Sequence, residues 1–116
     1  PAPIGPYSQA VAFGDTLYVS GQIALDPLTG ELNMQSLEQE TEQVMQNLKA
    51  VLAAAGADFS SVLKSTIFLS DMQLFSDVNA IYARYFNENP PARETVQVAG
   101  LPKGVNVEIS VIAGLY

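Results

Sequence analysis

One arginine of the sequence lies where a fixed positive charge is expected. Arg93 follows two consecutive prolines in Pro90-Pro91-Ala92-Arg93-Glu94-Thr95, a loop that we expect to enter a strand. Because proline restricts the backbone, this loop should hold the guanidinium in one place. A guanidinium binds a carboxylate through two parallel hydrogen bonds, which lysine cannot reproduce. The segment therefore predicts a carboxylate-binding group. The alternatives are a solvated surface arginine or one paired with Glu94.

A second candidate is a carboxylate within an apolar strand. Glu108 lies in Val105-Asn106-Val107-Glu108-Ile109-Ser110-Val111, where alternation places Val107 and Ile109 on one face and Glu108 on the other. Partial desolvation raises the pKa of a carboxyl group toward a range that suits proton transfer. The strand therefore predicts a general acid or base at Glu108. The alternative is a glutamate on an edge strand that faces water.

Four further residues carry weaker signals. Tyr7 lies on an arm constrained by proline, in Gly5-Pro6-Tyr7-Ser8-Gln9. Ser20 and Gly21 interrupt an apolar strand, and a glycine there lets a ligand approach the backbone N–H closely. Asn79 flanks the apolar stripe of a predicted helix. For each of these residues taken alone, packing or an ordinary surface position is the simpler interpretation.

The residues that are missing restrict the chemistry further. The 116 residues include no His and no Cys, which removes an imidazole base, a thiolate nucleophile and a zinc site of the usual Cys/His type. The formal net charge is −7, and the few basic residues are scattered, so a nucleic-acid partner is not expected. No apolar run approaches the roughly 20 residues of a membrane helix, and no signal peptide is visible. We therefore expect a cytoplasmic protein with no membrane partner.

The elements that must position these residues follow from the hydrophobic periodicity. Ser36 with Gln39 forms a capping box, and Gly56 is a natural end for the helix that follows. The order predicts an α+β fold in one domain, residues 1–116, with two helices packed on one face of a mixed sheet. Strands are predicted at 10–14, 16–23, 62–69, 95–99 and 105–113, and helices at 36–55 and 73–87.

The predicted strands carry apolar residues on both faces. In the segment 62–69, Leu63 and Ile67 are expected on one face and Phe68 on the other. Two helices cannot cover both faces of the sheet, and monomers rarely expose a large apolar patch. We therefore expect a homo-oligomer that packs the uncovered faces together. The alternative is an ordinary scatter of apolar surface residues.

Six segments distributed over the chain form a recognisable set. They are Ile4-Gly5-Pro6-Tyr7-Ser8-Gln9, Val19-Ser20-Gly21-Gln22-Ile23, Asn47-Leu48-Lys49-Ala50-Val51-Leu52, Pro91-Ala92-Arg93, Val98-Ala99-Gly100-Leu101-Pro102-Lys103 and Val107-Glu108-Ile109. The spacing of Pro-Ala-Arg from Leu-Pro-Lys is quite specific. Together the segments resemble the RidA/YjgF family of reactive-intermediate deaminases. The resemblance implies a chorismate-mutase-like fold with a six-stranded type of sheet, assembled as a homotrimer with sites in the clefts between subunits.

The resemblance also implies an activity. Members hydrolyse 2-aminoacrylate and 2-aminocrotonate, through their imine tautomers, to pyruvate or 2-oxobutanoate plus ammonia, as 2-iminobutanoate/2-iminopropanoate deaminases. The ligand is then a small 2-imino or 2-oxo acid, and no cofactor or metal is needed. Two alternatives come from other descriptions of relatives. One is a non-catalytic regulatory trimer that binds small carboxylates. The other is an endoribonuclease or translation inhibitor, against which the net charge of −7 argues.

The resemblance assigns roles to particular positions of this sequence. They are Arg93 as the carboxylate-binding arginine, Glu108 as the acid/base glutamate, Tyr7 as a group that orients water or substrate, Ser20 and Asn79 as side chains lining the cleft, and Gly21 and Thr95 as backbone donors. Many members have cysteine where this chain has Thr95, which removes a thiol but keeps the N–H. Glu94 is less typical of the family, and we expect it to compete with a substrate for Arg93.

Overall fold

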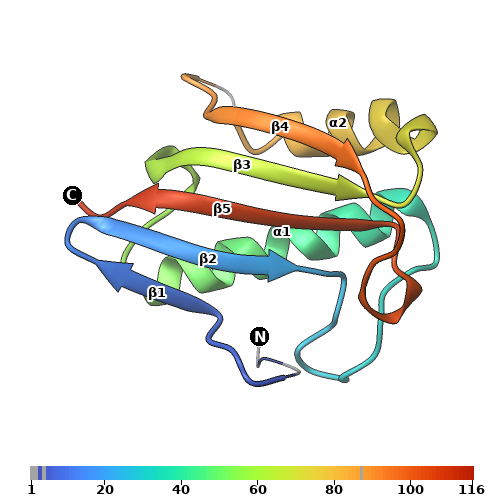
Figure 1. Cartoon of the computed structure of the whole chain (residues 1–116), viewed down its shortest axis with the longest axis horizontal. Helices are drawn as coiled ribbons and strands as arrows, with labels where there is room; N and C mark the ends of the chain where they lie inside the picture. Colours follow the sequence, from blue (N-terminus) through green and yellow to red (C-terminus); the bar gives the residue numbers. More distant parts are fainter. Residues whose placement is uncertain (1–2, 4, 87) are drawn as a thin grey trace.

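The computed structural model describes residue 3, residues 5–86 and residues 88–116. These residues form one sheet of five strands in the order β1-β2-β5-β3-β4, and both α-helices lie on the same side of it (Figure 1). The strands are β1 (Ala10–Phe13), β2 (Thr16–Gln22), β3 (Val62–Leu69), β4 (Ala92–Gln97) and β5 (Val107–Gly114). The helices are α1 (Leu37–Ala54) and α2 (Phe75–Ala83), with short 3-10 turns at Phe59–Ser61, Met72–Leu74 and Pro102–Gly104.

The expectation of a six-stranded type of sheet is wrong for the described residues, which form a sheet of five strands. After β2 the chain turns back at residues 26–30, and a single isolated bridge joins Leu25 to Leu32. The turn uses the backbone groups that a further strand would need, because Gly30 donates its N–H to the Asp26 carbonyl at 2.8 Å. Pro27 also lacks an N–H. The pairing therefore stops after one bridge.

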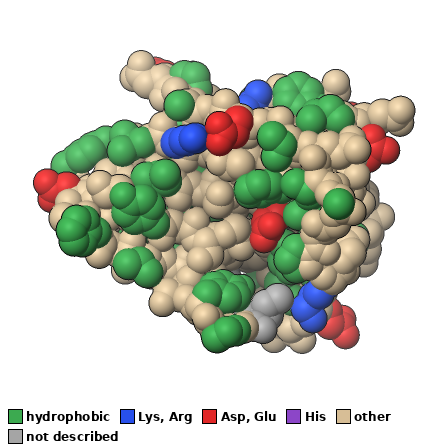
Figure 2. Space-filling view, viewed as in Figure 1, with side chains coloured by type: hydrophobic (Ala, Val, Ile, Leu, Met, Phe, Trp, Pro, Cys, Tyr) green, Lys and Arg blue, Asp and Glu red, His purple; other side chains and the backbone are tan. Residues whose placement is uncertain are grey.

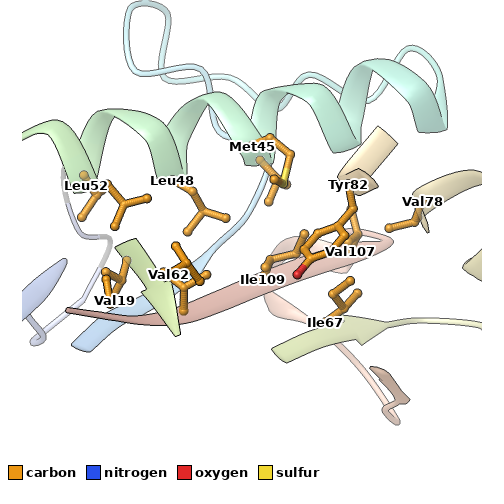
Figure 3. Packing of buried hydrophobic residues seen from close by; sticks show 14 of the residues in the cluster. Val19, Met45, Leu48, Leu52, Val62, Ile67, Val78, Tyr82, Val107 and Ile109 are labelled. Carbon is orange, nitrogen blue, oxygen red and sulfur yellow. The ribbon is translucent and has the colours of Figure 1, made fainter. Parts of the chain in front are cut away.

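The first helix begins where its capping box predicts. The Ser36 side chain accepts a hydrogen bond from the Gln39 N–H at 3.0 Å, which satisfies one of the free donors at the helix N-terminus. The helix ends at Ala54, two residues before Gly56, whose φ of 76° suits glycine. Its apolar stripe packs on the sheet, with Met45, Leu48 and Leu52 pointing toward the strands (Figure 3).

The second helix is shorter than the predicted 73–87. Residues 72–74 form a 3-10 turn, and the α-helix covers only Phe75–Ala83. Beyond it, the N–H groups of Arg84 and Tyr85 bind the carbonyls three residues earlier, those of Ile81 and Tyr82. Such bonds tighten the chain and end the α-helix. Residue 87 lies outside the described residues.

The sheet is mixed, and its register places β4 beside β3. The two strands run parallel, from the pair Lys64–Ala92 to the pair Leu69–Gln97. β4 therefore begins at residue 92 and not at 95, so Arg93 lies within the strand. On the other side, β3 pairs with β5 antiparallel, and the register shifts between Val62 and Lys64. This irregularity removes Leu63 from the buried face, contrary to the expected alternation, and leaves it exposed.

The two faces of the sheet have different surroundings. The face toward the helices carries the core, in which Ile67, Val107 and Ile109 are buried (Figure 3). The other face has no helix over it, and hydrophobic side chains are spread across it (Figure 2). Exposed apolar side chains of the strands include Val11, Phe13, Tyr18 and Val96. In the described part of the chain, no helix has the length and hydropathy to cross a bilayer.

Candidate functional site

Arg93 projects from β4 toward α2. It pairs with Ser65 of β3, which is fully buried on the helix-covered face. One guanidinium nitrogen, Nη1, donates a hydrogen bond to Asn79 Oδ1 at 2.6 Å. The guanidinium carbon lies 5.5 Å from the ring centre of Phe75 and 5.1 Å from that of Tyr82. Because the side chain as a whole is exposed, Arg93 is a fixed cation that a ligand can reach.

A groove of about 470 Å³ lies beside this guanidinium. The prolines that we expected to fix the arginine form part of its wall, together with aromatic and small side chains. The lining residues are Asn79, Tyr82, Ala83, Phe86, Pro90, Pro91 and Arg93. A concave, largely apolar wall with one fixed charge suits a small organic acid.

Thr95 lies on the same face of β4 as Arg93, two residues further along. It pairs with Ile67, whose side chain is buried under the helices. The Thr95 Oγ1 atom is buried and has no hydrogen-bond partner among the described residues. Asn79 is bonded to Arg93, and Thr95 lies beside Arg93 on the same face of β4. We call these three residues the cation half of the site.

Glu94 does not compete for the guanidinium, contrary to the expectation from the sequence. Adjacent side chains of a strand point to opposite faces, so Glu94 lies on the uncovered face. There its carboxylate pairs with Lys64, with 3.2 Å between Nζ and Oε2. Arg84, the other arginine of this region, is exposed, and its Nη1 lies 3.9 Å from a carboxylate oxygen of Glu38.

Glu108 lies on the uncovered face of the sheet, near the middle of its width. It pairs with Phe68 of β3, while its neighbours Val107 and Ile109 are buried toward the helices. Burial raises the pKa of the Glu108 carboxyl group above its ordinary value. Within the described part of the chain, no hydrogen bond or ion pair holds the carboxylate. Its proton is therefore bound more tightly than that of an exposed glutamate.

Gly21 makes room for the Glu108 carboxylate. A Cβ atom at position 21 would lie 2.7 Å from Glu108 Oε2, closer than van der Waals contact allows. The pairing of β2 with β5 also shifts its register between Val19 and Gln22, so Gly21 lies in an irregular stretch. A glycine is needed here because the carboxylate of the next strand lies directly against its backbone.

Ser20 attaches the arm that carries Tyr7. Its Oγ donates to the Ser8 carbonyl at 2.6 Å, and its N–H donates to the Gln9 carbonyl at 2.9 Å. The Gln22 side chain adds a third bond, from Nε2 to Gln9 Oε1, at 2.6 Å. Tyr7 is 43% exposed at the end of this arm. The Ser20 hydroxyl therefore binds the protein's own backbone.

The residues predicted for the site thus fall into two groups. Tyr7, Ser20, Gly21 and Glu108 form the second group, which we call the carboxylate half. Glu108 lies on the uncovered face of the sheet, and Arg93 lies on the helix-covered face. A single chain therefore does not direct both side chains into one pocket. Among the described residues there is also no cluster of three acidic side chains placed to hold a metal ion.

The sequence interpretation missed the partners that hold these groups. Phe75 and Tyr82 of α2 pack with the core, and both rings also contact Arg93. Glu40 lies in the first turn of α1, where a carboxylate favours the positive end of the helix. It is 1% exposed, and its carboxylate accepts hydrogen bonds from the N–H and Nδ2 of Asn106, both at 2.8 Å. Glu40 thereby fixes the start of the strand that carries Glu108. Glu40 lies four residues before Val44, on the apolar stripe of α1. This position was the available signal that Glu40 is buried.

Known proteins resemble this chain over nearly its full length. The family described as endoribonuclease L-PSP matches residues 1–115. The chain is 48% identical to the human 2-iminobutanoate/2-iminopropanoate deaminase, over 97% of this chain and 82% of that protein. It is 52% identical to the putative regulator AldR of Lactococcus lactis, over 97% and 90%.

The fold is similarly close to solved structures. RidA from the Antarctic bacterium Psychrobacter sp. PAMC 21119 superposes with a TM-score of 0.94 at 44% identity, over 98% of this chain and 92% of that chain. The α+β architecture, with two helices on one face of the sheet, is therefore that of RidA. With the family match and the identities above, the chain belongs to the endoribonuclease L-PSP family, the RidA/YjgF family that its six sequence segments resemble.

Proposed function

We propose that this protein hydrolyses the C=N bond of small 2-imino acids. The substrates are 2-aminoacrylate and 2-aminocrotonate in their imine forms, and the products are pyruvate or 2-oxobutanoate and ammonia. The observation that carries the proposal is the exposed guanidinium of Arg93, held beside a groove by a hydrogen bond and two ring contacts. The human relative named 2-iminobutanoate/2-iminopropanoate deaminase, 48% identical, supports it.

Arg93 binds the substrate carboxylate. Asn79 occupies Nη1, so the other guanidinium N–H groups can pair with the two carboxylate oxygens. An imine carbon is already electrophilic, so fixing it near a water molecule supplies much of the catalysis. Positioning of this kind can contribute several kcal/mol. Because Arg93 binds the substrate carboxylate, the site also selects 2-imino acids over imines that lack a carboxylate.

Glu108 acts as the general base and the general acid of the reaction. The carboxylate takes a proton from water as the water oxygen bonds to the C=N carbon. It passes this proton to the imine nitrogen, which gives a carbinolamine. The carboxylate then takes the proton of the new hydroxyl group and passes it to the amino nitrogen, so that the C–N bond breaks, the C=O bond forms and ammonia leaves. Burial raises the pKa of Glu108, so its carboxylate is a stronger base than that of an exposed glutamate. Tyr7 on its arm orients the water or the substrate, and the backbone N–H groups of Gly21 and Thr95 are further donors to the ligand.

The complete site forms between subunits of a homotrimer. Two observations support this part of the proposal. Arg93 and Glu108 lie on opposite faces of one sheet, and the uncovered face exposes Val11, Tyr18 and Val96. A cation half from one chain and a carboxylate half from its neighbour would then complete each site. Sedimentation analysis should give a trimer.

Mixed trimers test the same arrangement. Arg93→Ala and Glu108→Gln proteins, each weakly active alone, should regain activity when they are unfolded and refolded together. Some sites then combine an intact Arg93 from one subunit with an intact Glu108 from another. Mixtures that stay as inactive as the separate proteins would show that each chain uses its own two residues.

A second candidate function is the binding of a small carboxylate without turnover. The cation half lies within one chain and needs no Glu108. The relative named putative regulator AldR, 52% identical, favours this alternative. An endoribonuclease would match the printed family description, but RNA binding requires a basic surface and the net charge is −7.

The deciding experiment generates 2-aminoacrylate in situ with a serine dehydratase and follows pyruvate release. The wild-type protein should accelerate the release, and Arg93→Ala should abolish the acceleration. Arg84→Ala is the matched control, because it removes an exposed arginine of the same region that pairs only at 3.9 Å with Glu38. An absence of acceleration at every protein concentration, with 2-oxobutanoate still bound, would leave the binding function.

A further inference from the structure

The guanidinium of Arg93 lies against an aromatic pair formed by Phe75 and Tyr82. Its central carbon is 5.5 Å from the first ring centre and 5.1 Å from the second. Both distances are within the range of cation–π attraction. Together with the Asn79 hydrogen bond, the aromatic pair leaves the cation few alternative rotamers. Long arginine side chains are otherwise flexible, and ordering one on ligand binding lowers affinity.

Tyr82 is itself fixed relative to Arg93. Its hydroxyl hydrogen-bonds the Ser65 hydroxyl at 3.0 Å in the buried interior, and Ser65 pairs directly with Arg93 in the sheet. The ring also packs on Phe86, with 4.7 Å between centres. Tyr82 is 5% exposed. The hydroxyl is therefore anchored to the same row of the sheet from which the guanidinium projects.

The electrostatics agree with this geometry. Burial raises the pKa of Tyr82, while the hydrogen bond to Ser65 and the positive charge of Arg93 oppose the rise. The phenol stays protonated at neutral pH, so the ring offers its neutral π-face to the cation.

We propose that Tyr82, with Phe75, is a positioning residue that orients the Arg93 guanidinium for two-point binding of the substrate carboxylate. The inference rests on the proposed function, because it takes a 2-imino acid as the ligand of Arg93. The two rings hold the guanidinium carbon within cation–π range, and the N–H groups that Asn79 does not occupy are left for the ligand. A planar carboxylate binds such a pair of N–H groups through two parallel hydrogen bonds. Tyr82 also lines the groove, so a double-mutant cycle with Arg93 must separate its action through the guanidinium from direct contact with the ligand.

The test measures the dissociation constant of 2-oxobutanoate by NMR titration, together with KM and kcat for 2-aminoacrylate. Tyr82→Leu should weaken 2-oxobutanoate binding roughly threefold to tenfold, the size of a cation–π contact with its ordering effect. KM should rise by a similar factor, and kcat should change less. Tyr82→Phe keeps the ring and should bind within about twofold of wild type, although its melting temperature should fall because Ser65 loses its partner.

Tyr85→Leu is the matched control. This tyrosine follows the same helix, and its hydroxyl is bonded to Glu42, at 2.7 Å from Oε1. Its ring packs on Phe59, 5.1 Å away, and not on Arg93. The control variant should lose stability while it keeps the wild-type dissociation constant. Equal weakening of binding in Tyr85→Leu and Tyr82→Leu would overturn the inference.

A double-mutant cycle separates positioning from general packing. In the Arg93→Lys background, Tyr82→Leu should weaken binding by less than about twofold, because the group that it positions has gone. The same fold-loss in both backgrounds would show that Tyr82 acts independently of Arg93 and would overturn the proposal. If Tyr82→Leu does not fold, Phe75→Leu replaces it in the cycle, since Phe75 is only partly buried.

The binding measurement keeps this inference distinct from the proposed function. A wild-type protein that binds 2-oxobutanoate but hydrolyses no imine would refute the deaminase, and the cycle would still decide the role of Tyr82. A wild-type protein that does not bind 2-oxobutanoate would overturn both proposals.

Discussion

The cation half and the carboxylate half of the site are built in opposite ways. Arg93 has a hydrogen bond and two ring contacts, all with α2. Glu108 lies against the backbone of Gly21, and the described residues give its carboxylate no hydrogen bond or ion pair. The Arg93 guanidinium is held by direct partners. The Glu108 carboxylate is partly withdrawn from water and has no such partner among the described residues. A group that binds needs a fixed direction, and a group that transfers a proton needs a pKa near the working pH.

If this contrast is correct, the largest loss of activity should come from a substitution of Glu108. Glu108→Gln keeps the size of the side chain but cannot accept a proton from water. We expect kcat for imine hydrolysis to fall roughly 100-fold to 10,000-fold, the usual contribution of a general acid or base, while 2-oxobutanoate binding is retained. Glu38→Gln, which alters an exposed carboxylate of α1, is the control. Equal losses in binding and turnover would make Glu108 a structural residue.

The next largest effect, a loss of ligand affinity, should come from a change in the orientation of the N–H donors at position 93. Arg93→Lys keeps the charge but loses the planar pair of donors. Losing one charge-assisted hydrogen bond costs about 1.5 kcal/mol, so 2-oxobutanoate binding should weaken roughly tenfold. Titration calorimetry of both proteins measures the difference. Unchanged affinity would mean that the charge alone binds the ligand and that the orientation by α2 is irrelevant.

A smaller effect is expected from the glycine that accommodates the carboxylate. In Gly21→Ala the new Cβ would meet Glu108 Oε2 at 2.7 Å and displace a flexible side chain. We expect kcat to fall about fivefold to tenfold, because a shift of about 1 Å can cost even more. Gly100→Ala is the matched control, since a Cβ there meets nothing within 4 Å. A fully active Gly21→Ala protein would show that the position of Glu108 is not critical.

The smallest effect is a change in the pH dependence of stability. Burial raises the pKa of Glu108, so the folded protein holds this proton more tightly than the unfolded chain. Its contribution to stability is therefore complete below the ordinary Glu pKa of about 4.3 and is lost as the pH rises through the raised value. Glu108→Gln does not titrate. Its melting temperature, relative to wild type, should be higher at pH 8 than at pH 4, and thermal scans at both values test this.

Local patterns in the sequence predicted one side of this comparison better than the other. The alternation around Glu108 predicted that it lies on the other face of the sheet from Val107 and Ile109, and the structure confirms this. Ser36 also begins its helix as the capping box predicts. Both features depend on neighbours within a few residues along the chain.

The surroundings of Arg93 depend on long-range pairing and could not be predicted in this way. A loop was expected at position 93, whereas β4 already begins at Ala92 because it pairs in parallel with β3. That pairing decides that Arg93 faces α2 and that Glu94 faces Lys64. No spacing in the sequence indicates a parallel register. The partners of Glu40 are likewise remote in sequence, since Asn106 immediately precedes β5 and Val107 is the first residue of that strand.

The parallel β3–β4 pair also bears on the order in which the site forms during folding. The contacts of Arg93 all lie within the strand–helix–strand unit of residues 62–97. The contact between Gly21 and Glu108 joins segments near the two ends of the chain. Closing the shorter loop costs less chain entropy, and contacts between distant segments slow folding. A refolding chain should therefore form the surroundings of Arg93 before those of Glu108. A late folding intermediate would then bind the ligand before it could hydrolyse an imine.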